Sequence, residues 1–203
     1  MNKPYMMTDE PKAVKANGDS PIHLTVESMD NDVYFYADVD SDRVLALIRS
    51  LTELDSRLRL EADQRGRPEN PDPIRLHINS NGGYMDAMAA STDFVQRLKT
   101  PVHTIIEGVA ASAASLLALA GRKRFITPKS FILIHQFSDF VWGNYGDFED
   151  RAKLHEMLWD QMIDFYAQHT KLTKNKLKKM LRHEFWMNAT EAVEYGFVDE
   201  ILE

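Results

Sequence analysis

The sequence predicts an α/β fold in which a largely parallel sheet is built from repeated strand–helix units. Short apolar segments rich in β-branched residues alternate with longer segments whose apolar residues recur at helical spacing. Such alternation favours right-handed crossovers between parallel strands. The chain has 203 residues, of which 44% are hydrophobic and 27% charged, a composition that suits one globular domain with a substantial core.

Each element is predicted from its local pattern. Residues 1–21 are polar and contain proline and glycine, which is typical of a mobile arm, so the predicted domain spans residues 22–203. The β-branched and aromatic segments predicted as strands are 33–36, 74–78, 102–106, 124–126 and 131–134. The segments with apolar residues three and four positions apart, predicted as helices, are 41–60, 84–98, 112–120, 148–169, 174–182 and 190–196.

Composition excludes several classes of protein. A formal net charge of -7, from 24 basic and 31 acidic residues, argues against nucleic-acid binding, and the basic run Lys171–Lys179 reads as a solvated helix face. The absence of cysteine excludes disulfides and thiolate zinc sites. No apolar run near the N-terminus has the length of a signal peptide or membrane span, so we expect a soluble, cytoplasmic protein with no membrane partner.

A candidate nucleophile follows the strand predicted at 102–106. In the segment Gly108-Val109-Ala110-Ala111-Ser112, a glycine permits a sharp turn, small residues allow close passage, and a serine opens a helix. The mechanics are those of a nucleophile elbow, and the helix N-terminus favours developing negative charge. The alternative is that Ser112 merely caps the helix. Ser115, one helical turn on, is a weaker candidate and fits packing within the helix better.

Two further features lie just beyond strand ends. His135 closes the apolar strand at 131–134, where an imidazole is suited to act as a general base for Ser112. Gly82-Gly83 follows the strand at 74–78, and paired glycines let backbone amides approach a ligand and form an oxyanion hole. The alternatives are a structural histidine and an ordinary tight turn. Ligands of parallel sheets gather at the carboxyl ends of strands, which favours the functional interpretation.

Four segments together resemble the signature segments of ClpP, the proteolytic subunit of the ATP-dependent Clp protease. They are Asn79-Ser80-Asn81-Gly82-Gly83, Gly108-Val109-Ala110-Ala111-Ser112, Ile134-His135-Gln136, and Glu191-Ala192-Val193-Glu194-Tyr195-Gly196-Phe197-Val198-Asp199. Their order and approximate separations match that family, and the resemblance extends from about residue 32 to residue 203. It implies a fold of the ClpP/crotonase type, a spiral of βαβ units with a protruding handle helix at 148–169.

The resemblance also implies a reaction. Ser112 is then the nucleophile, His135 the general base, and the amides of Gly83 and Ala113 the oxyanion hole of a serine endopeptidase with an acyl-enzyme mechanism. The family's third member is an aspartate at the position of Glu184, so this chain is a divergent member with glutamate as the triad acid. A glutamate orients the imidazole in other hydrolases, although its extra methylene requires a local adjustment. No metal or organic cofactor is implied.

Partners follow from the same resemblance. It implies a homo-oligomeric, heptameric ring, with a stacked double ring formed through the handle helix, that degrades peptides or unfolded proteins delivered by an AAA+ unfoldase or shared with related ClpP-like subunits. The chain departs from the family at Asn81 and Phe137, where the family has proline, and at 138–146, where a Gly-rich segment is replaced by bulkier residues. The bulkier segment at 138–146 leaves the specificity of the cleft open. The arm before Asp32, which lacks the family's pore-gating sequence, and a longer loop at 57–73 leave the unfoldase partnership open.

Three other interpretations are open. The first is a non-catalytic or weakly active ClpP-like ring subunit that mixes with active relatives, for which Glu184 is the one point in favour. The second is a crotonase-type acyl-CoA enzyme, which would share the backbone oxyanion hole and need no Ser–His pair. The third is a binding or assembly protein such as a phage head-maturation component.

Overall fold

The computed structural model describes residues 26–203, so the predicted arm at 1–21 lies outside the described residues. The strands are β1 (Val26–Met29), β2 (Asp32–Phe35), β3 (Ile74–Ser80), β4 (Val102–Ala111), β5 (Lys123–Ile126), β6 (Phe131–Ile134), β7 (Phe185–Asn188) and β8 (Glu200–Ile201). The helices are α1 (Ser41–Gln64), α2 (Met85–Arg97), α3 (Ala113–Leu119), α4 (Tyr145–His169), α5 (Lys174–Met180) and α6 (Ala189–Tyr195).

The eight strands form one sheet and confirm the predicted α/β class. The main path runs β1-β2-β3-β4-β5-β8, while β6 pairs with the far end of β4 and β7 pairs with β6. The pairs β1/β2 and β6/β7 are antiparallel, and the others are parallel. Strands β1, β7 and β8 were not among the predicted elements. All three are short, and none has an alternating apolar pattern.

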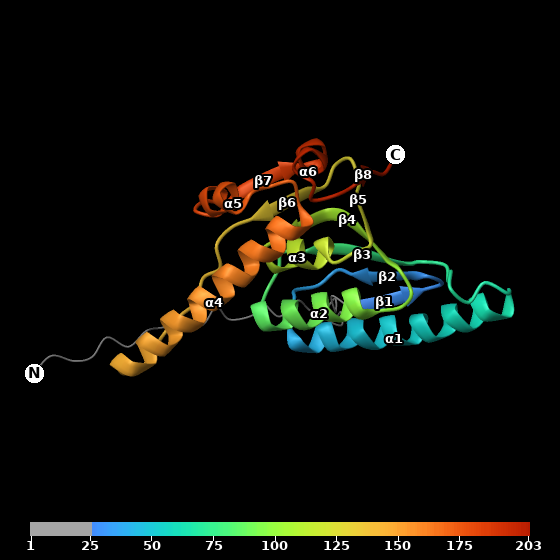
Figure 1. Ribbon diagram of the computed structural model, residues 1–203, viewed down its shortest axis with the longest axis horizontal. Helices are drawn as coiled ribbons and strands as arrows, with labels where there is room; N and C mark the ends of the chain where they lie inside the picture. The colour runs from blue at the N-terminus through green and yellow to red at the C-terminus, as the bar shows by residue number, and fades with distance from the viewer. Residues whose placement is uncertain (1–25) are drawn as a thin grey trace, which may run out of the picture.

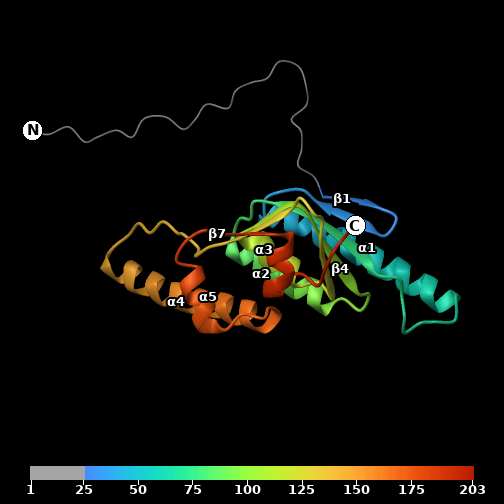
Figure 2. The same cartoon turned by 90° about the horizontal axis from the view of Figure 1, so that it is seen from above.

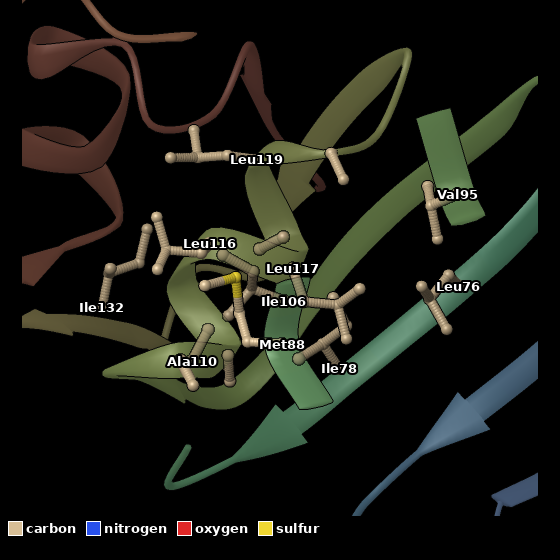
Figure 3. Packing of buried hydrophobic residues seen from close by; sticks show 14 of the residues in the cluster. Leu76, Ile78, Met88, Val95, Ile106, Ala110, Leu116, Leu117, Leu119 and Ile132 are labelled. Atoms are coloured by element: carbon tan, nitrogen blue, oxygen red, sulfur yellow. The ribbon is translucent and has the colours of Figure 1, made fainter. Parts of the chain in front are cut away.

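Helices α1, α2 and α3 cover one face of the sheet (Figures 1 and 2). The Asp40 side chain accepts a hydrogen bond from the amide of Arg43 at the start of α1, and the helix then buries one stripe of apolar residues. The centre of the core lies between the sheet and α3, where Ile78 and Ile106 meet Leu117 (Figure 3). This packing fixes the carboxyl ends of β3 and β4 relative to α3, the edge at which the candidate site residues lie.

Helix α4 protrudes from the body, as expected of a handle helix (Figure 1). It begins three residues earlier than predicted because Asn144 and Asp147 form a capping box at its N-terminus. Its buried residues all belong to its C-terminal half: Met162, Ile163 and Tyr166. The N-terminal half therefore stands away from the core. None of the helices within residues 26–203 combines the length and apolar content needed to cross a membrane.

Strand β4 corrects one prediction about the turn that leads to Ser112. The strand does not end at residue 106, and the chain does not leave the sheet at Gly108, because β4 continues to Ala111. Gly108, with φ of 83°, bends the strand without breaking it. Before the bend β4 pairs with β5, and after it with β6. The sharp turn into the helix is made by Ser112 itself.

Candidate active site

Ser112 joins β4 to α3 in a backbone conformation that few residues other than glycine adopt. Its φ and ψ angles are 52° and -124°. Among the described non-glycine residues, only Asp30 also has a positive φ. Strain of this kind persists where the surroundings fix it, and it is common at functional sites. The amide of Ser112 donates to the carbonyl of Leu133 at 2.9 Å, which holds the junction against β6.

The hydroxyl of Ser112 does not cap α3. Ser112 occupies the N-cap position, but its side chain makes no capping hydrogen bond. The residue is partly exposed and lines a cavity, so its hydroxyl is available to a ligand. Ser115 is instead buried, with its hydroxyl 2.6 Å from the carbonyl oxygen of Ser112 and 2.7 Å from the hydroxyl of Tyr166. Ser115 therefore packs within the helix, as the sequence suggested.

His135 follows the last residue of β6, the strand that lies beside the end of β4. The pairing of Ala111 with Leu133 brings together the segments that follow the two strands, and Ser112 and His135 line the same cavity. No hydrogen bond joins the Ser112 hydroxyl to the His135 imidazole in this conformation of residues 26–203. Such bonds are often long in ligand-free enzymes and tighten when substrate binds. The structure thus brings the candidate nucleophile and base together.

The first of the paired glycines, Gly82, lies directly against the serine, and the second, Gly83, lies against Val39. A Cβ at Gly82 would come within 2.7 Å of the Cβ of Ser112, and one at Gly83 within 2.2 Å of the carbonyl oxygen of Val39. Gly83 also lines the cavity, and Ala113 is the first residue of α3. Neither the Gly83 amide nor the Ala113 amide donates a hydrogen bond to another described residue. An oxyanion hole requires amides without protein partners, and both candidate amides have this property within the described chain.

The cavity beside Ser112 has a volume of about 530 Å³, in the range of ligand-binding clefts. Its apolar lining comes from α2, α4 and the segment after His135, and includes Met85, Phe137, Leu154 and Leu158. The candidate serine and histidine thus open onto a largely apolar cleft between the body and α4.

A charged cluster in the cavity wall was not predicted from the sequence. Asp139 Oδ2 accepts hydrogen bonds from Arg151 Nε at 2.5 Å and from His155 Nε2 at 2.8 Å. The hydrogen bond from His155, together with the Arg151 guanidinium, holds the pKa of the Asp139 carboxyl below its ordinary value. The sequence offered one signal: Arg151 and His155 are four residues apart and so share a face of α4. Their acidic partner lies on an irregular segment, where no periodic pattern marks it.

Glu184 lies opposite His135 at the ends of two paired strands. The antiparallel ladder between β6 and β7 ends with the pair Ile134 and Phe185, and His135 and Glu184 are the next residue on each side. Glu184 is exposed, does not line the cavity, and makes no hydrogen bond to the imidazole within the described chain. The structure therefore places Glu184 and His135 just beyond the last paired residues of the same ladder, without a hydrogen bond between them. No group of three or more His, Cys, Asp or Glu residues within 26–203 is arranged to hold a metal ion.

Comparison with known proteins identifies the family of this chain. The family model described as Clp protease matches residues 59–203. An ATP-dependent Clp protease proteolytic subunit from Deinococcus radiodurans is 33% identical over 177 residues, which cover 86% of this chain and 81% of the relative. An ATP-dependent Clp protease proteolytic subunit 1 from Protochlamydia amoebophila is 35% identical over 181 residues, which cover 86% of this chain and 82% of the relative. The chain therefore belongs to the Clp protease family and has its ClpP-type fold.

Proposed function

We propose that this chain is a serine endopeptidase, the proteolytic component of a Clp-type protease. Ser112 attacks the carbonyl carbon of the scissile peptide bond while His135 accepts its hydroxyl proton. The resulting imidazolium protonates the leaving amine, and the neutral imidazole then activates the water that hydrolyses the Ser112 ester. The amides of Gly83 and Ala113 stabilise the oxyanion in both steps. Neither a metal nor an organic cofactor takes part in these steps.

One observation carries this proposal. Ser112 adopts a positive φ at the strand–helix junction with its hydroxyl uncapped, and it shares one cavity with His135. A serine that served only as a helix cap would bond the first-turn amides and would not need a strained backbone. The crotonase-type acyl-CoA interpretation requires no serine in this position, and the family relationship does not favour it.

We also propose Glu184 as the third member of the triad. Its support is its position opposite His135 across the β6/β7 ladder. In the cavity itself, the carboxylate nearest to His135 along the chain, Asp139, is already bound by Arg151 and His155. Glu184 would reach the imidazole by rotation of its exposed side chain, which costs little because no bond is lost.

The assembly proposed is a homo-oligomeric ring of seven subunits that stacks into a double ring in the cytoplasm. It is supported by the names of the two relatives, which describe them as proteolytic subunits of an ATP-dependent protease. It is also supported by large exposed apolar side chains on and before the protruding half of α4, namely Phe140, Trp142, Tyr145, Phe148 and Met157. Substrates are peptides or unfolded chains, delivered by an AAA+ unfoldase or degraded in rings shared with related ClpP-like subunits.

The proposal is tested by hydrolysis of an unfolded fluorescent protein substrate by the purified chain. We expect Ser112→Ala and His135→Gln to abolish turnover, and Glu184→Gln to lower kcat by at least about tenfold. Matched controls are Ser56→Ala on the exposed face of α1 and Glu194→Gln on α6, which should behave as wild type. Turnover that survives Ser112→Ala would refute the proposal.

One observation favours the alternative function, that of a non-catalytic or weakly active ring subunit. The exposed Glu184 carboxylate does not contact His135, as expected of a non-catalytic or weakly active ring subunit that mixes with active relatives. Such a subunit would be inert alone and would raise or redirect the activity of a relative with which it assembles. Glu184→Asp, which restores the family's acid, would then increase the activity of the chain rather than lower it.

A further inference from the structure

The segment that follows His135 has few polar ties to the rest of the fold. The amide of Gln136 donates to the carbonyl of Leu181 at 2.9 Å. Among the described residues, this is the last backbone hydrogen bond between the segment after β6 and another part of the fold before α4 begins. From there to the start of α4 the chain has no regular secondary structure. Within the described chain, the side chain of Asp139 makes the polar contacts that connect residues 137–143 to other elements. The polar contacts of this segment therefore depend on one carboxylate, while Phe137 adds apolar packing against the core.

The partners of that carboxylate are both on α4. Arg151 Nε and His155 Nε2 donate to the same oxygen, Asp139 Oδ2, at 2.5 and 2.8 Å. The rings of Phe137 and His155 form a T-shaped pair, with centroids 5.3 Å apart and planes at 79°. Arg151 and His155 lie one helical turn apart, so they hold the segment along the helix rather than at a single point. We name Asp139, Arg151 and His155 the clasp.

The clasp lies in the wall of the cavity that contains Ser112 and His135. Four peptide units separate His135 from Asp139, and the hydrogen bond from Gln136 to Leu181 lies between them, so the clasp and this bond together hold the backbone that follows the imidazole. The side chains of the ion pair are partly exposed, 43% for Arg151 and 25% for Asp139, and exposed pairs of this kind contribute little to stability. Loss of the clasp is therefore expected to alter geometry at His135 more than folding.

We propose that the clasp positions His135 for general-base catalysis. Its three residues are positioning residues, since they act through the 136–139 backbone and do not reach the reacting atoms. This inference rests on the proposed peptidase function, in which the distance from the imidazole to the Ser112 hydroxyl controls the rate. Small misplacements of a catalytic group reduce turnover steeply.

The test compares Asp139→Asn, Arg151→Gln and their double mutant with wild type. Lys153→Gln is the matched control, because the Lys153–Asp150 pair is on the same helix, 3.5 Å apart, and largely exposed outside the cavity. The rate of hydrogen exchange in residues 136–143 measures whether the clasp holds this segment. The kcat and KM for a short fluorogenic peptide measure whether His135 is correctly positioned. Arg151→Lys, which keeps the charge, tests rescue.

We expect faster exchange in both single variants and a kcat lowered about tenfold with KM nearly unchanged. The double mutant should be no worse than either single variant, because both remove the same contact. Arg151→Lys should recover part of kcat, and Lys153→Gln should match wild type in both measurements.

Unchanged exchange in Arg151→Gln would refute the clasp. Faster exchange with wild-type kcat would show that the clasp holds the segment without positioning His135. A wild-type chain that hydrolyses nothing would refute the proposed function and, with it, the positioning role. Hydrogen exchange would then still show whether the clasp holds the segment, so failure of the clasp can be distinguished from failure of the proposed peptidase function.

Discussion

The serine at the end of β4 combines an unfavourable backbone conformation with close contacts on the side away from the cavity. Ser112 has a φ of 52°, a conformation that costs a non-glycine residue about 1–3 kcal/mol. The cost is offset by the hydrogen bond of its amide to Leu133 and by the contact of Ser115 with its carbonyl. The backbone of Gly82 packs so closely against the Cβ of Ser112 that no larger residue fits there. The geometry of the candidate nucleophile therefore depends on residues from three separate elements.

Gly82→Ala is predicted to disturb the site without removing any candidate catalytic group. The added Cβ would lie 2.7 Å from both the Cβ of Ser112 and the carbonyl oxygen of Ala111, and the φ of Gly82 is 99°. Overpacking of this kind costs about 1–3 kcal/mol of unfolding free energy. We expect peptide hydrolysis to fall at least about tenfold. Gly146→Ala, whose Cβ would come no closer than 3.3 Å to a neighbour, is the control and should retain activity.

The Ser115–Tyr166 pair gives a second prediction at this scale. Burial raises the pKa of the Tyr166 hydroxyl, which is 2.7 Å from the hydroxyl of Ser115. Ser115→Ala leaves this buried hydroxyl without a partner and should lower the unfolding free energy by about 1–3 kcal/mol. Tyr166→Phe should cost less, because Ser115 still donates to the Ser112 carbonyl. Urea unfolding of both variants checks the order, and a larger loss in Tyr166→Phe would contradict it.

At the scale of elements, the sequence predicted helices and strands well where the local pattern is strong. It failed where a segment becomes a strand only by pairing with a distant strand. The buried stripe of α1 was predicted because its apolar residues recur at helical spacing, and β6 because it is a short, continuous apolar run. The strand β7 was missed because Phe185–Asn188 acquires its strand conformation from pairing with β6. That same pairing gives Glu184 its register opposite His135. The register was therefore not predictable from local pattern.

Substitutions in the two halves of helix α4 are predicted to have different effects on stability and assembly. Met162 is 4% exposed in the core, so Met162→Ala should lower the unfolding free energy by about 2–5 kcal/mol. Met157 is 69% exposed on the protruding half, so Met157→Ala should leave subunit unfolding within about 0.5 kcal/mol of wild type. Sedimentation velocity should instead show that Met157→Lys weakens the proposed oligomer. A Met157→Lys variant with wild-type assembly would argue against an interface on this half of α4.

At the scale of the whole molecule, charged groups link strands that are distant in sequence. Asp32 at the start of β2 accepts hydrogen bonds from Arg75 Nε and Nη2, each at 2.5 Å, and lies 2.9 Å from His77 Nε2. The hydrogen bonds from Arg75 lower the pKa of the Asp32 carboxyl. Because the folded-state pKa lies below the unfolded value of about 3.9, this group stabilises the fold above that pH. The stabilisation is lost as the pH falls through the folded-state pKa.

Asp32→Asn is therefore predicted to destabilise the protein in a pH-dependent way. At pH 7 we expect the variant to lose about 1–2 kcal/mol of unfolding free energy, a modest loss because Arg75 is half exposed. Near pH 3 the difference should shrink, since protonation of Asp32 weakens the same contacts in wild type. Urea titrations at the two pH values measure the difference. A difference in unfolding free energy between wild type and Asp32→Asn that is as large at pH 3 as at pH 7 would contradict the stabilising role of the Asp32 carboxylate.

The central claim is that Ser112 is an activated nucleophile, and labelling with a fluorophosphonate probe tests it most directly. The labelled residue is located by peptide mass spectrometry in wild type, Ser112→Ala and Glu184→Ala. The account predicts a covalent adduct on Ser112, none in Ser112→Ala, and slower labelling in Glu184→Ala. An intact, folded wild-type protein that acquires no adduct, or one modified at a different serine, would contradict it.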